Sequence, residues 1–306
     1  MKFSVFTAST PDWTPEQAVT ELARQGWDGI EWRVTDQSPA PEGEGPGFWA
    51  GNLASIPLAG LEAEVPRLRA LGEAAGLEVS GIGGYVPCTQ HEDVERMLAA
   101  TAAWGASQVR VVVPALGTVS WNGRPASGIA QPELFEQARK DFQWVAGRAK
   151  EHGVKALVEL HHNTLTASAS SAMRLLDGLD PEQVGVIHDL GNLQIEGYED
   201  HLAAFQLLGP YLAHVHVKNG VWVRDDAPSA SAEALGESDP FATAAWHHEW
   251  APINEGIHSV VEYLRTLREF GYDGWVTLED FSTVLPLAER TAFNLEYMRR
   301  AWEAAQ

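Results

Sequence analysis

Residues 150–160, KEHGVKALVEL, hold the pattern that decides the fold of this chain. A helical segment ends at Gly153, an apolar run follows at once, and the run closes on the acidic residue Glu159. Glycine is the residue that most easily adopts the left-handed conformation at the end of a helix. The same order of helix, glycine and short apolar run recurs in EAAGLEV (73–79) and REFGYDG (268–274). The sequence therefore predicts a repeating unit of one strand and one helix.

Eight such units can be counted along the chain. The predicted strands are Phe3–Phe6, Gly29–Arg33, Glu78–Gly83, Gln108–Val113, Ala156–Leu160, Val184–His188, Leu212–Val217 and Trp275–Glu279. Strict alternation of strands and helices implies parallel pairing, and eight units favour closure of the sheet. We therefore predict an α/β fold in which residues 1–306 form a single (β/α)8 TIM barrel domain. An open, doubly wound sheet is the alternative, although no Gly-x-Gly-x-x-Gly follows a strand as a dinucleotide-binding fold requires.

Three connections that follow strands are long: residues 34–59, 114–131 and 219–255. In a barrel, the loops after the strands lie on the face that carries the active site. The third connection is rich in aromatic side chains that could form a lid, a subunit contact or an ordinary packed loop, namely Trp222, Trp246, His247, His248 and Trp250.

Charge and cysteine content limit the partners and the compartment. The chain has 21 Lys and Arg against 42 Asp and Glu, a formal net charge of -21, and no basic cluster, which argues against a nucleic-acid partner. Cys88 is the only cysteine and cannot form an internal disulfide, which suits a reducing cytoplasm. The first residues, MKFSVFTASTPDW, lack the continuous apolar run of a signal peptide or membrane span. We expect a cytoplasmic protein without a membrane partner.

Four ionisable residues close the last four predicted strands: Glu159, Asp189, His216 and Glu279. Functional side chains of a barrel project from these strand ends. Three carboxylates and an imidazole that converge there would repel one another and lose hydration unless a cation compensated them. Each residue alone is more simply explained by a salt bridge, but core packing does not explain charges at the ends of four successive strands. We predict one divalent metal ion, with Mn²⁺ ranked first and Mg²⁺, Co²⁺ or Zn²⁺ open.

Strand alternation identifies neighbours of these four residues. His161 has the parity of Glu159, and His214 and Lys218 have the parity of His216, so all three are expected to face the lumen. His161 could bind a substrate hydroxyl, and Lys218 could stabilise an anionic oxygen of the substrate. A structural role is the alternative for each.

Other charged or imidazole side chains allow less specific predictions. Glu31 and Arg33 share a parity at the end of the second strand, so they could form a buried ion pair or touch substrate. Arg110 is expected to pair within the barrel. His162 and His188 have the opposite parity in their strands, which points them toward the helices.

At these residues the chain resembles the xylose isomerase-like superfamily of barrels, in particular its sugar phosphate isomerase/epimerase group. The resemblance rests on an ordered set of stretches: GWDGIEWR, VELHH, HDLGNLQIEGYED, LGPYLAHVHVKN and GYDGWVTLED. It implies that Glu159, Asp189, His216 and Glu279 are the metal ligands and that the two glutamates move a proton. It also implies an isomerase or epimerase of carbohydrate metabolism, which acts on a sugar or sugar-like molecule through a metal-stabilised enediolate. By analogy, the protein is expected to be a homodimer or homotetramer.

The chain also departs from the pattern of that group. The group often has Glu-Asn-His where this chain has Glu159-Leu160-His161. It also often has Asp-x-x-His where this chain has Asp189-Leu190-Gly191-Asn192. The AP endonucleases of the superfamily use that histidine, with others on the second and third strands, to hold several zinc ions, so one metal is the better expectation here. Asn192 joins the candidates for substrate binding, which are His161, Lys218, Asn192, Glu31 and Arg33.

Two other functions remain open from the sequence. An inosose dehydratase-type lyase would begin with the same proton abstraction, so the motifs do not separate it from an isomerase. A barrel that only binds carbohydrate would need no acid/base pair, and the presence of both glutamates favours an enzyme.

Overall fold

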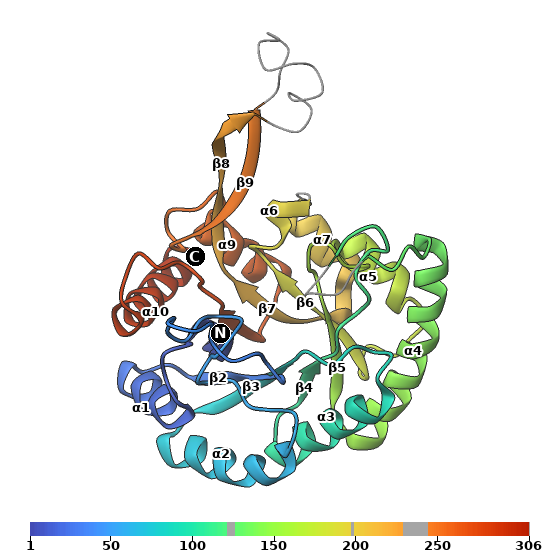
Figure 1. Ribbon diagram of the computed structural model, residues 1–306, viewed down its shortest axis with the longest axis horizontal. Helices are drawn as coiled ribbons and strands as arrows, with labels where there is room; N and C mark the ends of the chain where they lie inside the picture. Colours follow the sequence, from blue (N-terminus) through green and yellow to red (C-terminus); the bar gives the residue numbers. More distant parts are fainter. Residues whose placement is uncertain (121–125, 197–198, 229–243, 306) are drawn as a thin grey trace.

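The computed structural model describes residues 1–120, 126–196, 199–228 and 244–305. Its centre is a closed barrel of eight parallel strands in the order β1-β10-β7-β6-β5-β4-β3-β2 (Figure 1). The strands are β1 Lys2–Phe6, β2 Gly29–Val34, β3 Glu78–Gly84, β4 Gln108–Arg110, β5 Lys155–Glu159, β6 Val184–Asp189, β7 Leu212–Val217 and β10 Trp275–Leu278. The predicted (β/α)8 TIM barrel is therefore confirmed, and the open sheet is excluded.

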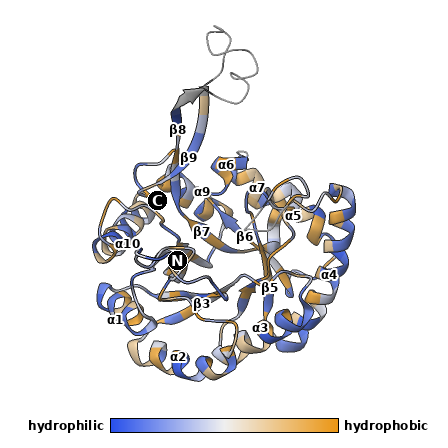
Figure 2. Ribbon diagram, in the orientation of Figure 1, coloured by the Kyte–Doolittle hydropathy of each residue, from blue (hydrophilic) through white to orange (hydrophobic). Residues whose placement is uncertain are grey.

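Helices form a ring around the barrel (Figure 1). They are α1 Pro15–Gln25, α2 Leu61–Ala75, α3 His91–Trp104, α4 Gln131–His152, α5 Ala169–Leu176, α6 Leu193–Glu196, α7 His201–Leu208, α9 Val260–Phe270 and α10 Leu287–Ala304, with short 3-10 turns η1 Thr7–Ser9 and η2 Gly209–Tyr211. Hydrophobic and hydrophilic residues alternate along the ring helices in Figure 2. This is the pattern of helices that cover a core on one side and meet water on the other.

Local signals fix where these helices begin and end. Thr14 caps α1 in a reciprocal capping box with Gln17, and Pro15 occupies the first turn. Gly26 ends the helix with a φ of 88°. Gly153 ends α4 in the same way, with a φ of 66°, so that the chain turns directly into β5. The predicted order of helix, glycine and strand is thus observed on both sides of the barrel.

Near the functional face, the fourth strand differs most from prediction, and the ends of β2, β3, β5, β6 and β10 differ by one residue each. The fourth strand was predicted to reach Val113, but β4 ends at Arg110. Beyond it, Val112 forms only an isolated bridge with Pro87, because the chain leaves the sheet before Pro114. The last strand, β10, ends one residue before Glu279, whose backbone amide still donates to the carbonyl of Val217 at 2.9 Å.

The connection 219–255, predicted as a long loop, contains an antiparallel ribbon of β8 Asn219–Pro228 and β9 Ala244–Ala251. β-Branched and aromatic residues such as Val221, Trp222 and Val223 favour a strand, which the loop prediction overlooked. The ribbon projects away from the barrel (Figure 1). Trp222 and Trp246 on it are exposed, at 40% and 57%.

The connection 34–59 folds back over the barrel and is anchored by Asn52. The buried Asn52 amide donates to the carbonyl of Ala8 at 3.0 Å and of Thr7 at 3.3 Å. In the connection 114–131, residues 121–125 lie outside the described residues. Among the helices that the structure describes, none has the length and apolar character needed to cross a membrane.

Candidate metal centre and cavity

The barrel brings the four predicted strand-end residues together. One ligand atom from each of Glu159, Asp189, His216 and Glu279 lies within 4.8 Å of the corresponding atoms of the other three. Asp189 on β6 and His216 on β7 are direct partners in the sheet register. All four side chains are buried. The site therefore arises from neighbouring strands and needs no special loop.

His216 is oriented as a metal-binding imidazole would be. Its Nε2 lies 3.0 Å from the Glu31 carboxylate, which fixes the proton on that nitrogen. Its Nδ1 is buried without a hydrogen-bond partner and faces Glu159 Oε1 at 3.5 Å, Asp189 Oδ2 at 3.6 Å and Glu279 Oε2 at 3.7 Å. A lone nitrogen surrounded by three carboxylate oxygens is a donor set that suits a divalent cation. The residues present therefore fit the predicted metal.

Glu31 is held between two histidines. Its Oε2 also lies 2.8 Å from His214 Nε2, while His214 Nδ1 contacts the Gln108 amide at 2.8 Å. The predicted lumen orientation of His214 is observed. The ion pair proposed between Glu31 and Arg33 is not formed, because Glu31 turns across the lumen toward β7. Glu31 is also not among the described residues that line the cavity, so it lies behind His216 and away from the substrate space.

Lys218 was predicted to contact the substrate, and it lies within the carboxylate cluster. Its ammonium group donates to Asp189 Oδ2 and to Glu279 Oε2. The adjacent Gly191 permits this position, since a methyl group there would overlap with the Lys218 side chain. The lysine thus supplies a positive charge between two of the predicted metal ligands.

Arg110 pairs within the barrel, and its partner is the predicted catalytic residue Glu159. Its Nη1 donates to Glu159 Oε2, and its Nε donates to the carbonyl of Gly84 at 2.9 Å. Asn192 Nδ2 approaches the other oxygen of the same carboxylate at 3.4 Å. Parity in the fourth strand indicates that Arg110 faces the lumen, but which carboxylate it meets depends on the neighbouring strand.

Burial and charge set the proton affinities of these groups. Burial by itself would raise the pKa of both glutamates, but Arg110 holds the pKa of Glu159 well below its usual value. Lys218 and His216 similarly lower the pKa of Glu279 against the effect of burial. For Asp189, burial outweighs the nearby lysine and raises the pKa. Both glutamates are thus anionic at neutral pH, as ligands and proton acceptors must be.

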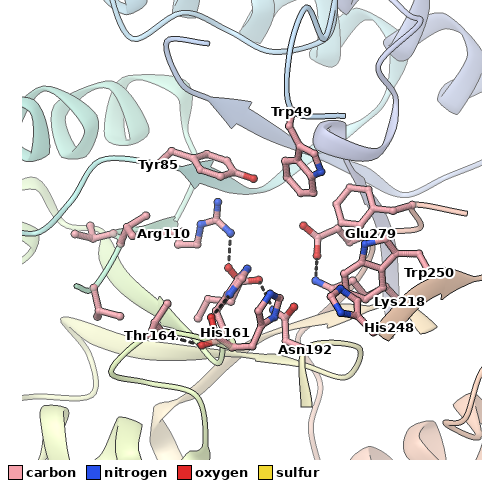
Figure 3. A pocket seen from close by; sticks show the side chains of 16 residues that line it. Trp49, Tyr85, Arg110, His161, Thr164, Asn192, Lys218, His248, Trp250 and Glu279 are labelled. Atoms are coloured by element: carbon pink, nitrogen blue, oxygen red, sulfur yellow. Dashed lines mark hydrogen bonds and ion pairs between the residues drawn. The ribbon is translucent and has the colours of Figure 1, made fainter. Parts of the chain in front are cut away.

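A cavity of about 280 Å³ opens directly above the cluster. Figure 3 shows Arg110 on one side of it, and Glu279 and Lys218 on the other. Its described walls are Trp49, Tyr85, Arg110, Val111, Val112, Val113, Glu159, His161, His162, Thr164, Asn192, Lys218, His248, Trp250, Glu279 and Phe281. A volume near the lower end of the range for ligand pockets suits a small molecule, and aromatic walls suit the faces of sugar rings.

The remaining histidines test the parity argument. His161 lines the cavity, and so does His162, which was predicted to turn toward the helices. That prediction was wrong because β5 ends at Glu159, so strand alternation no longer applies at residue 162. His188 follows its parity: it contacts the Tyr263 hydroxyl of α9 at 2.8 Å and packs against Phe205 of α7.

Several wall residues were not identified from the sequence. Trp49 comes from the connection 34–59 and Tyr85 follows β3, whereas His248 and Trp250 come from the ribbon, whose aromatic residues the sequence had indicated as a possible lid. The glycines at the end of β3 indicate close packing there: Gly83 leaves room for the ring of Phe6, which stacks on His216 with centroids 5.5 Å apart. Arg33 lies outside this cavity, in the wall of an adjoining one.

Comparisons with known proteins agree with this architecture. A family model described as xylose isomerase-like TIM barrel matches residues 19–301. An inosose dehydratase of Lacticaseibacillus casei is 23% identical over 53% of this chain and 55% of its own length, so the match spans about half of that relative. A 3-dehydroshikimate dehydratase of Bacillus anthracis is 24% identical over 78% of this chain and 81% of its own length.

Solved structures extend the likeness of the fold to the whole chain. The structure of a 3-keto-D-glucoside 4-epimerase from E. coli superposes with a TM-score of 0.67 and 16% identity, covering 98% of this chain and 99% of that one. At this identity the likeness concerns the fold alone. The family match over residues 19–301, together with the closed barrel, shows that the chain belongs to the xylose isomerase-like TIM barrel family.

Proposed function

We propose that this protein is a metal-dependent isomerase or epimerase that moves a proton at a carbon next to a carbonyl group of a small, sugar-like substrate. The observation that carries the proposal is the unpartnered Nδ1 of His216, which three carboxylates face at the floor of a cavity. A divalent ion held by Glu159, Asp189, His216 and Glu279 would polarise the carbonyl and acidify the adjacent C–H bond. Mn²⁺ is our first choice for that ion.

The two glutamates are the proposed proton carriers. They lie at the ends of separate strands, Glu159 as the last residue of β5 and Glu279 directly after β10, and each is held by its own cation, Arg110 for Glu159 and Lys218 for Glu279. One carboxylate would take the proton from the substrate carbon, and the other would return it on the opposite face in an epimerase. Return to the neighbouring carbon would give an isomerase. Fixed carboxylates on two sides of the substrate reduce the cost of orienting a base for each step.

The polar walls give the substrate its orientation. His161, Asn192 and Thr164 offer hydrogen-bonding groups, and Trp49, Trp250 and Phe281 offer apolar faces. Lys218 would stabilise the negative charge that grows on the carbonyl oxygen when the proton leaves. The four proposed ligands themselves are buried at the floor of this cavity.

Elimination of water is the second candidate function. Both curated relatives described above are named dehydratases, and elimination starts with the same proton transfer. The imidazoles of His162 and His248 lie in the same cavity wall and could carry a proton to a leaving hydroxyl group. A barrel that binds carbohydrate without reaction is the third reading.

Solvent-deuterium exchange with product analysis separates these readings. The protein loaded with Mn²⁺ would be incubated in D₂O with ketoses, aldoses, inososes and 3-dehydroshikimate. An isomeric product of unchanged skeleton, with one deuterium on carbon, supports the proposal. A product that has lost water assigns the lyase. Stoichiometric metal with neither exchange nor product assigns a binding protein.

Variants then assign the two carboxylates. Glu159→Gln and Glu279→Gln are expected to abolish exchange and to weaken metal binding. Glu296→Gln is the matched control, because it removes the same charge from a side chain that is 72% exposed on α10. Full exchange activity in both cavity variants would refute the assigned proton carriers.

A further inference from the structure

Two arginines converge on one aromatic ring beside the proposed active site. The guanidinium carbon of Arg110 lies 4.2 Å from the Tyr85 ring centroid, and that of Arg33 lies 5.0 Å from it. Both arginines are almost fully buried, with exposures of 4% and 3%. Two cations that lose their hydration so close together are costly unless anions accompany them.

Only one of these arginines has an anionic partner. Arg110 is paired with Glu159, whereas the Nη1 of Arg33 donates to the neutral oxygens of Gln37 at 3.0 Å and Ser55 at 2.7 Å. Within the described ranges, no carboxylate forms an ion pair with Arg33. Arg33 Nε and Arg110 Nη2 are buried without hydrogen-bond partners. The pair therefore retains both unmatched charge and unmatched N–H donors.

The balance of charge changes sign when the metal is counted. The described cluster has four buried carboxylates and three buried cations, which are Glu31, Glu159, Asp189, Glu279, Arg33, Arg110 and Lys218. With His216 counted as neutral, as a metal ligand must be, a divalent ion would turn one excess negative charge into one excess positive charge. A ligand with a single negative charge would restore neutrality in this buried region.

The position of Arg33 indicates where that negative charge would lie. Arg33 lines a second cavity of about 630 Å³, which shares Trp49, Tyr85, Val112 and Val113 with the cavity above the metal centre. Asp36, the carboxylate in its described wall, is exposed and accepts from the backbone amides of Leu58 and Ala59. A substrate whose reacting carbons lie above the metal centre could thus extend past Tyr85 toward Arg33.

We propose that Arg33, assisted by Arg110, binds a carboxylate group of the substrate, so that the substrate class is a hydroxycarbonyl acid. This inference rests on the proposed function, because it places the reacting carbons at the metal centre. The planar guanidinium matches the two oxygens of a carboxylate. A carboxylate also carries the single charge that the cluster lacks, whereas a phosphate monoester carries nearly two.

Binding of three probes that differ only at carbon 6 tests the proposal: D-fructose, D-fructuronate and D-fructose 6-phosphate. Their affinities for the Mn²⁺-loaded protein would be measured by calorimetry, for the wild type, Arg33→Gln and Arg33→Lys. Arg67→Gln is the matched control, because it removes one positive charge from an exposed position on α2. Melting temperature and metal content of each variant establish that the fold and the metal centre are intact.

We expect wild-type protein to bind D-fructuronate roughly tenfold more tightly than D-fructose, as one charged hydrogen-bonded contact would give. Arg33→Gln should remove that preference, Arg33→Lys should retain part of it, and Arg67→Gln should retain all of it. Equal binding of the acid and the neutral ketose by wild type would overturn the inference, even if Arg33→Gln fails to fold. Tightest binding of D-fructose 6-phosphate would overturn it in favour of a phosphate site.

The result that would refute the proposed function differs from the result that would refute the carboxylate site. Deuterium exchange into neutral sugars with no preference for the acid leaves proton-transfer chemistry in place and refutes only the carboxylate site. Tight binding of the acid without exchange into any substrate refutes the enzyme and leaves the carboxylate site standing.

Discussion

Replacement of Glu31 by glutamine should weaken metal binding although Glu31 is not a predicted ligand. The Glu31 carboxylate accepts from His216 Nε2 at 3.0 Å and from His214 Nε2 at 2.8 Å, and it is 1% exposed. Glutamine is nearly isosteric but neutral, so both contacts lose charge assistance, which accounts for about half the strength of such bonds. The His216 ring then loses the partner that makes its Nδ1 electron-rich.

The size of the effect follows from the class of contact. Loss of a carboxylate behind a metal-binding histidine typically costs about 10- to 100-fold in metal affinity, or roughly 1.4 to 2.7 kcal/mol. We expect Glu31→Gln to fall within that range for Mn²⁺, measured by competition with a fluorescent chelator. Glu78→Gln is the control, since Glu78 lies on the exposed end of β3, with a side-chain exposure of 59%.

Two results would contradict this reasoning. A dissociation constant within twofold of wild type, in a variant that melts normally without metal, would show that Glu31 does not support the site through His216. An equal loss in Glu78→Gln would show that overall charge, and not the His216 contact, controls affinity.

Three further predictions concern packing, loop anchoring and pH. Gly83→Ala should destabilise the protein by about 1–3 kcal/mol, because the new methyl overlaps with Phe6. Phe6→Leu in the same chain should recover part of the melting temperature. If the losses of the two single variants simply add in the double variant, the overlap is refuted. Asn52→Ala should cost about 1–3 kcal/mol in urea unfolding, because the buried carbonyl of Ala8 loses its hydrogen bond from the Asn52 amide. It should also loosen the connection that carries Trp49, and unchanged quenching of tryptophan fluorescence by acrylamide would count against that. Contact with Arg148 lowers the pKa of Glu95 from 4.5 to about 2, so this carboxylate stabilises the fold above pH 4.5, and the contribution is lost as pH falls toward 2. Glu95→Gln should therefore lower the melting temperature at pH 7 but hardly at pH 2, and an equal loss at both pH values would refute the linkage.

The sequence predicted the parts of this structure that depend on local pattern. Helices that end on glycine before apolar runs identified the strands, and closure of eight strands follows from their number. Once the barrel is assumed, Glu159 and Asp189 must approach His216, because strand ends of a parallel barrel meet at one rim. That is why four residues spread over more than a hundred positions could be grouped in advance.

The parts that were missed depend on contacts across the lumen, or on residues beyond a strand end, where strand alternation no longer applies. Glu31 meets His214 and His216 on the far side of the barrel, and parity gives only the face of a residue, not its partner. His162 lines the cavity because β5 ends at Glu159, so strand alternation does not set its direction. Trp49 and Tyr85 belong to segments without periodicity. The single-domain extent, the oligomeric state and the cytoplasmic location stay predictions.

The ribbon β8–β9 contributes to the cavity wall, whereas the barrel strands hold the carboxylates in position. Its strands pair with each other and not with the described barrel strands, yet His248 and Trp250 reach the cavity wall. Substitution, lengthening or transplantation of the ribbon would thus change what the wall presents to a ligand, while the hydrogen-bond register beneath the carboxylates stays the same. Such modularity gives descendants of this chain a route to new ligands that does not disturb the cluster of Glu159, Asp189, His216 and Glu279.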